Sequence, residues 1–258
     1  MAKRPNADDR RGMPTGRPTP AAKPARGVQT NLAELAYDRL EEMIVTCALR
    51  PGLLLSIQDL QDRTGLGRTP VHQAVSRLAA DTLVVVRPRH GLQIATVDLA
   101  RERALLPLRR DMERFVVRLA AERCDASHRN QMLHLARVLR GRASAMGIDE
   151  FNRLDRRVDR LLIAAAAEPF LEGAMRVLHT IFRRTGWIYH SLVRPEEGLR
   201  RTVECHLDVL DAVAANRARD AVAAADRLVD FSGSMFDALG RGTDPALFDC
   251  NLEMREAG

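Results

Sequence analysis

The sequence has few aromatic side chains, which make up 4% of its 258 residues, and only four cysteines. The cysteines are far apart and form no CxxC pair; they are Cys47, Cys124, Cys205 and Cys250. This spacing argues against a disulfide framework or a zinc site and is typical of reduced thiols in the cytosol. Because alanine and leucine are abundant where aromatic residues are scarce, we expect a mainly helical protein.

Long apolar runs are also missing. No segment approaches the roughly 20 residues that a membrane-spanning helix needs, and the amino terminus lacks the apolar core of a signal peptide. We therefore expect a cytoplasmic protein that does not associate with membranes. Since 46% of the residues are apolar, the chain can still fill the cores of two domains.

Acidic and large apolar residues are scarce in residues 1–30, which contain five prolines. Seven basic and two acidic residues give this segment a charge of +5, most of the net charge of +6 of the chain. This composition predicts a disordered basic arm. The arm either adds non-specific affinity for nucleic acid through counterion release or only keeps the protein in solution.

Residues 55–95 contain the signals of a helix, a tight turn, a second helix and a hairpin. Ser56 can cap a short helix that stops at Gly65, because glycine accepts the left-handed conformation of a sharp turn. A second helix begins near Gly67, and its apolar residues recur at helical spacing: Val71, Ala74, Val75, Leu78 and Ala79. Two strand-like runs, 83–86 and 92–95, follow as a hairpin. This order predicts a winged helix-turn-helix.

The second helix and the hairpin carry the positive charge of this module. Residues 34–62 contain two basic and six acidic side chains, whereas residues 63–96 contain five basic and one acidic. If the helix lies in a major groove, side chains off its apolar stripe reach phosphates and base edges. The candidate DNA-contacting residues on the helix and the hairpin tip are Arg68, His72, Gln73, Arg87, Arg89 and His90.

The run GRTPVHQAVSRL, followed by the basic hairpin, resembles the amino-terminal domain of the GntR family of bacterial transcription regulators, whose usual run is SRTPVREALxRLxxEGLV. The resemblance implies that Arg68, Thr69 and His72 contact operator DNA. It also implies that the tip of the wing, at His90 and Gly91, enters the minor groove.

The sequence departs from this family pattern at Gly67, His72 and Gln73. A histidine cannot make the two-pronged contact with guanine that an arginine makes. We therefore expect DNA binding with an altered base preference. A helix-turn-helix pattern on its own also occurs in ordinary helical proteins, so the specific motif carries this prediction.

The remaining sequence predicts an all-helical bundle. Asp98 is placed to cap its first helix, and Pro107 should kink or delay that helix. Six amphipathic segments cover roughly 99–123, 127–145, 148–167, 169–189, 195–215 and 217–239. The predicted parts of the chain are the basic arm (1–30), the winged helix (31–98), the helical domain (99–241) and a tail (242–258). The first helix of the winged helix is expected to end near Arg50.

Four polar side chains are expected inside the bundle. Asp155 and Asp159 lie one turn apart beside an apolar arc, His206 shares the apolar side of its helix, and Arg109 borders an apolar stripe. They could form a ligand or metal site, or a buried salt-bridge network without a ligand. The face of the same helix opposite this apolar arc is basic and carries Arg153, Arg156, Arg157 and Arg160.

Residues 99–239 resemble the FadR-type carboxy-terminal domain, the FCD domain, of one GntR subfamily. The family patterns RxxLE, DxxFH and HxxIL have counterparts at 109–113, 155–159 and 206–210. In metal-binding members an Asp and three His hold a divalent ion that faces an organic acid, and the early Arg helps to hold the acid. The resemblance thus implies effector contacts from Arg109, Asp155, Asp159 and His206.

The metal-ligand pattern of the family is incomplete in this chain. Only Asp155 and His206 match it, because Asp159 replaces the first His and Leu228 stands at the position of the last. A third ligand from Asp159 would still suit zinc, manganese or magnesium. We therefore keep a divalent metal site of Asp155, Asp159 and His206 as a hypothesis.

The sequence predicts a transcription regulator that acts on double-stranded operator DNA in the cytoplasm, associated with the nucleoid. The family resemblance implies that it is a repressor. That it is a homodimer and senses a small organic acid is what the family resemblance implies. The alternatives are a regulator whose pocket has lost its ligand, or a helical metal-dependent hydrolase. We expect no enzyme, because the chain contains neither HExxH nor a recognisable nucleophile motif.

Overall fold

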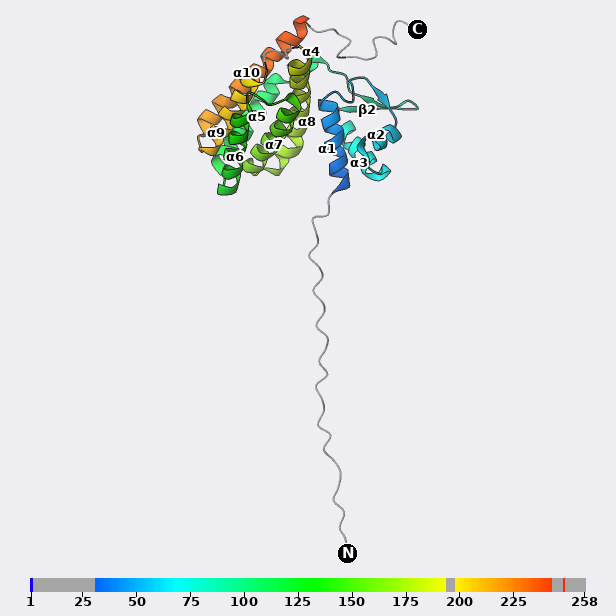
Figure 1. The fold of residues 1–258 in the computed structure, drawn as a ribbon, viewed down its shortest axis with the longest axis horizontal. Coiled ribbons are helices and arrows are strands. Elements are labelled where there is room, and N and C mark those ends of the chain that lie inside the picture. Colours follow the sequence, from blue (N-terminus) through cyan, green and yellow to red (C-terminus); the bar gives the residue numbers. More distant parts are fainter. Residues whose placement is uncertain (2–30, 194–197, 243–247, 249–258) are drawn as a thin grey trace. The chain divides into compact units, whose positions relative to one another are not determined.

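The computed structural model describes residues 31–193 and 198–242, together with Met1 and Phe248. The predicted basic arm, most of the predicted tail and Cys250 lie outside the described residues. The described part is helical apart from one small sheet, as the sequence predicts (Figure 1). None of its helices is long and apolar enough to cross a membrane.

The amino-terminal elements form the predicted winged helix-turn-helix. In chain order they are α1 (Leu32–Val45), β1 (Leu54–Leu55), α2 (Ile57–Thr64), α3 (Arg68–Ala80), β2 (Val84–Arg87) and β3 (Gly91–Ile94). The strands are antiparallel in the order β1-β3-β2, and Gln93 stands opposite both Leu54 and Val85. The two-residue strand β1 is too short to show an alternating pattern, so the sequence predicted only the hairpin of β2 and β3.

The turn between α2 and α3 follows from local signals. The Ser56 hydroxyl accepts a hydrogen bond from the Asp59 backbone N–H, and the Asp59 carboxylate accepts one from the Ser56 N–H, a complete capping box. Gly65 ends α2 in the left-handed conformation, with φ 67°. These caps fix the start of α3, whose predicted apolar residues Val71, Ala74, Val75 and Leu78 are buried.

The first helix ends earlier than the sequence predicts. We expected it to continue to Arg50, but α1 stops at Val45. Cys47 takes a left-handed conformation, with φ 53°, and donates to the Ile44 carbonyl, while the Leu49 N–H donates to the Met43 carbonyl. The last carbonyls of α1 are thus satisfied by a turn that needs neither proline nor glycine.

The carboxy-terminal elements form the predicted all-helical domain. They are α4 (Leu99–Ala104), α5 (Leu106–Arg123), α6 (Ala126–Arg142), α7 (Ile148–Ala166), α8 (Pro169–Ile188), a π-helical turn η1 (Tyr189–Val193), α9 (Arg200–Ala214) and α10 (Ala218–Gly242). Asp98 caps α4 as expected, accepting from the Arg101 N–H at 2.9 Å. The chain breaks at Leu105, just before Pro107.

Helix α8 connects the two domains. It packs against α7 of the helical domain and against α1 of the winged helix (Figure 1). Ile181 of α8 is buried in the same apolar core as Tyr37 and Leu40 of α1. The winged helix therefore completes its core with a residue of the helical domain.

Gly91, at the start of β3, gives a test of how the wing is held. Its φ is +88°, and a Cβ there would lie 2.6 Å from the Leu55 carbonyl oxygen of β1. Gly65 has a similar φ of +67° with nothing within 4 Å, so it is the matched control. Each alanine should lose about 1–2 kcal/mol of unfolding free energy to backbone strain, and Gly91→Ala should lose clearly more than Gly65→Ala in urea denaturation. Equal losses would contradict the close approach of β3 to β1.

Candidate functional site

The predicted DNA-contacting face of α3 is exposed. Arg68, Thr69, His72 and Gln73 are all on the surface, opposite the buried stripe of the helix. Within the described part of the chain, the side chains of Arg68, His72 and Gln73 make no hydrogen bond or ion pair. Their donors and acceptors are thus available to a partner outside the fold.

The wing is exposed in the same way. Arg87, Arg89, His90 and Gly91 all lie on the surface around the hairpin turn. The His90 N–H closes the turn on the Arg87 carbonyl at 3.0 Å, and the Arg87 Nε donates to Gln93 at 2.9 Å. The backbone of the tip is therefore held by the turn, while the side chains of Arg89 and His90 have no hydrogen bond or ion pair within the described residues.

The four polar residues predicted to converge inside the bundle do so. Arg109, Asp155, Asp159 and His206 line one small cavity of about 50 Å³. They come from α5, α7 and α9, so the helical spacing of the sequence identified the right face of each helix. A cavity of this size holds a water molecule or two, and an organic acid needs its walls to move.

Asp155 and His206 form one pair in this cavity. The His206 Nε2 lies 2.8 Å from an Asp155 oxygen, and its Nδ1 lies 2.7 Å from the Thr202 carbonyl. Burial by itself would lower the pKa of His206, but the Asp155 carboxylate and the Thr202 backbone raise it above the usual value. The imidazole can donate from both nitrogens only when it is protonated, so the pair favours a histidinium and a carboxylate.

A second histidine, which the sequence did not point to, binds the other acid. The His179 Nδ1 lies 3.3 Å from Asp159, and its Nε2 lies 3.2 Å from Glu113 of α5. Glu113 also accepts from the Arg109 Nε at 3.3 Å. Burial would raise the pKa of Glu113, yet His179 and Arg109 bring it down to about 2.

Asp159 is the exception among these acids. Burial raises its pKa to about 6, because the attraction of His179 is offset by the nearby Asp155 and Glu113 carboxylates. Asp159 is therefore the acid in this cavity that takes up a proton most easily near neutral pH. The sequence contained one signal for this second network of His179, Asp159 and Glu113. Glu113 is the last residue of the segment 109–113, the counterpart of the family pattern RxxLE that begins at Arg109.

The residues present do not fit a resident metal ion in this arrangement. Among the described residues no group of three or more His, Cys, Asp or Glu side chains could hold one. Asp155 and His206 bind each other, Asp159 is turned to His179, and Leu228 brings an apolar side chain to the cavity wall. Asp155, Asp159 and His206 thus share one cavity without forming a three-donor metal site among the described residues, and we derive no step through a metal.

Comparison with known sequences decides the family. A model of the bacterial regulatory proteins of the gntR family matches residues 32–94, and an FCD domain model matches residues 104–231. The chain is 30% identical over 180 residues to the HTH-type transcriptional repressor RspR of Escherichia coli (strain K12), covering 69% of this chain and 76% of RspR. The chain belongs to the GntR family. It is a DNA-binding transcription regulator with an FCD domain.

Solved structures of GntR-type regulators share the fold of this family member. Escherichia coli McbR/YncC superposes with a TM-score of 0.72 at 18% identity, covering 83% of this chain and all of McbR. A putative GntR transcriptional regulator from Rhodococcus sp. RHA1 superposes with a TM-score of 0.59 at 20% identity, covering 83% of this chain and all of the Rhodococcus chain. At these identities the likeness concerns the fold alone.

The Asp155 and His206 pair of this GntR regulator predicts a change in titration. In Asp155→Asn, burial is no longer opposed by the carboxylate, so the pKa of His206 should fall. The stabilising effect of the histidinium is present below the ordinary histidine pKa and is lost as pH rises through the raised one. As pH rises above the ordinary histidine pKa, the variant should therefore lose less unfolding free energy than the wild type.

NMR titration of the His206 ring measures this directly. Asp208→Asn is the control, since Asp208 is on the same helix but is exposed and pairs with Arg227. An unchanged His206 pKa in Asp155→Asn, or an equal fall in the control, would refute the pairing.

Proposed function

We propose that this protein is a cytoplasmic transcriptional repressor that binds operator DNA as a homodimer and responds to a small organic acid in its helical domain. The observation that carries the DNA-binding part is the exposed polar face of α3 beside an exposed basic wing, on a GntR fold. RspR, a relative over both domains, is named a repressor, and this supports the proposed direction of regulation.

The helical domain offers an apolar surface for the proposed dimer. Leu108 and Phe115 of α5 are 51% and 41% exposed. They are seven residues apart, so they lie on one face of the helix. Exposed apolar side chains that share a face are typical of protein interfaces, and two subunits would place two α3 helices for a two-part operator.

The interior cavity supports the proposed sensing. Arg109 and two histidines with raised pKa provide cationic partners for an acid. An effector must bind two arrangements of the protein with different affinity, or it regulates nothing. Because the cavity is small, an acid can enter only when pairs such as Asp155 and His206 separate, and this supplies two arrangements that differ in affinity.

A regulator without an effector is the second candidate. The four predicted residues already satisfy one another or a neighbour, the cavity is about 50 Å³, and Leu228 fills part of its wall. A closed, self-paired network is what the loss of a ligand would leave behind. Ligand screening separates these candidates.

The DNA-binding proposal is tested by two substitutions on α3. Arg68→Ala removes an exposed cation and should weaken binding to fragments selected from the source genome by about 1–3 kcal/mol. His72→Arg introduces the guanidinium fork and should shift base preference towards guanine at the contacted position. Gel shifts and selection of bound sequences measure both effects.

Arg137→Ala on α6 is the matched control for charge, because Arg137 is exposed and makes no ion pair among the described residues. It should leave affinity and preference unchanged. Binding profiles identical to the wild type for both α3 variants would sink the proposed docking.

The sensing proposal is tested by thermal denaturation with a panel of carboxylic acids. A true effector at 100 times its Kd should add about 2.7 kcal/mol of stability, and Arg109→Gln should abolish the gain. Arg110→Gln is the control, because Arg110 on the same helix pairs with Asp226 and Asp230 instead. The metal hypothesis predicts a further gain when zinc, manganese or magnesium is added, and no gain under any condition would favour the effector-free regulator.

A further inference from the structure

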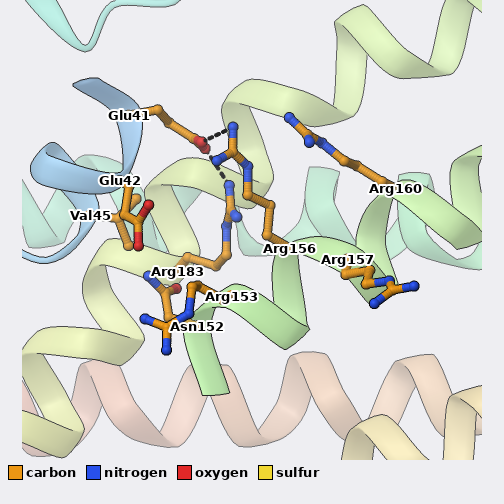
Figure 2. A pocket seen from close by; sticks show the side chains of 9 residues that line it. All are labelled: Glu41, Glu42, Val45, Asn152, Arg153, Arg156, Arg157, Arg160 and Arg183. Atoms are coloured by element: carbon orange, nitrogen blue, oxygen red, sulfur yellow. Dashed lines mark hydrogen bonds and ion pairs between the residues drawn. The ribbon is translucent and has the colours of Figure 1, made fainter. Parts of the chain in front are cut away.

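A second cavity lies where the winged helix meets the helical domain (Figure 2). Its volume is about 300 Å³, several times that of the interior cavity, for which 50 Å³ is found. Side chains from α1, α7 and α8 line it: Glu41, Glu42, Val45, Asn152, Arg153, Arg156, Arg157, Arg160 and Arg183. We refer to it as the junction cavity.

The junction cavity has a marked excess of positive charge. Five of its lining residues are arginines and two are glutamates. The arginines of α7 are the basic face that the sequence places opposite the apolar arc of this helix. One helix thus presents acids to the interior cavity and guanidinium groups to the junction cavity.

The carboxylates nearby satisfy only some of these arginines. Glu41 binds Arg183, and also Arg156 at 2.8 Å; Figure 2 shows both contacts. Asp38, which is not among the lining residues, binds Arg160 at 2.8 Å and also Arg156. Arg153 and Arg157 are exposed and have no ion pair or hydrogen bond within the described part of the chain.

Arginines on an open helix face are usually explained by their contact with solvent. This does not account for the junction cavity, because its arginines line a hollow. Here Arg156 and Arg183 converge on the buried Glu41, and Arg153, Arg157 and Arg160 line the same hollow from its exposed side, so positive charge is concentrated around a partly enclosed space. An anion in the hollow would compensate this charge. The fork of a guanidinium group matches the oxygens of phosphate and carboxylate.

We propose that the junction cavity binds a small anion with at least two negative charges, a phosphate ester or a polycarboxylate. Its volume is at the lower end of small-molecule sites, about 300–1,000 Å³, and is too small for duplex DNA. Arg153 and Arg157 supply the open donors. Because Arg156 and Arg183 also hold Glu41 of α1, the anion acts on the contact between the DNA-binding and helical domains.

Isothermal titration calorimetry of the full chain at low ionic strength tests this proposal. Pyrophosphate and citrate are the two probes, and we expect saturable binding of at least one of them with one site per chain. The double variant Arg153→Ser, Arg157→Ser should weaken that binding at least tenfold. Both residues are exposed and unpaired among the described residues, so the fold should persist, as thermal denaturation will verify.

The control double variant is Arg137→Ser, Arg219→Ser. It removes the same charge from arginines of α6 and α10 that are exposed and have no ion pair in the part of the chain that the structure describes, and it should change the affinity less than twofold. Tighter binding of pyrophosphate would identify the phosphate-ester class, and tighter binding of citrate the polycarboxylate class. Either result supports the proposal.

Three outcomes would overturn it. The first is that neither probe binds. The second is that the control variant loses as much affinity as the cavity variant, which would show general charge attraction. The third is that random duplex DNA displaces the bound probe in proportion to the length of the DNA, which would assign these arginines to nucleic acid. A fourth measurement separates the two cavities. Arg109→Gln should bind the probe like the wild type, and loss of binding there would place the anion in the interior cavity instead.

Discussion

The buried carboxylate of Glu41 on α1 ties the DNA-binding domain to the helical domain. It is 2% exposed, accepts from the Thr180 hydroxyl at 2.6 Å and binds Arg156 at 2.8 Å and Arg183. A charge buried this deeply is tolerated only while its partners are in place, and removing one is far more costly than an exposed ion pair would suggest. The position of α1, and through α1 of α3, therefore depends on helices α7 and α8.

Helix α8 also contacts the linker that follows the wing, so it holds the winged helix at a second place. Arg184 donates to the carbonyls of Ala95 and Thr96, in the linker after the wing, and to Glu102 of α4. Its neighbour Arg183 lines both the interior and the junction cavity. A ligand that moved Arg183 in either cavity would change the partners of Glu41, so this residue connects both cavities physically to the DNA-binding domain.

Much of this arrangement could be predicted because it is local. The capping box of Ser56, the break before Pro107 and the inward positions of Asp155 and His206 all follow from spacing along one helix. The partners could not be found this way. His179 meets Glu113, 66 residues away, and Glu41 meets Arg183, 142 residues away; such pairs depend on how helices pack. The basic face of α7 was therefore visible in the sequence, but the cavity it lines was not.

Charge balance limits what the interior cavity can accept. Asp155, Asp159 and Glu113 already place three carboxylates around Arg109 and two histidines, and Arg183 at the wall is paired with Glu41, so an incoming organic acid adds a negative charge with no matching cation. In a partly dry site that charge must be compensated. Because burial raises the pKa of Asp159 to about 6, this group takes up the compensating proton with the least cost. Acid binding and proton uptake are then linked, so any sensing by this cavity strengthens as pH falls towards 6.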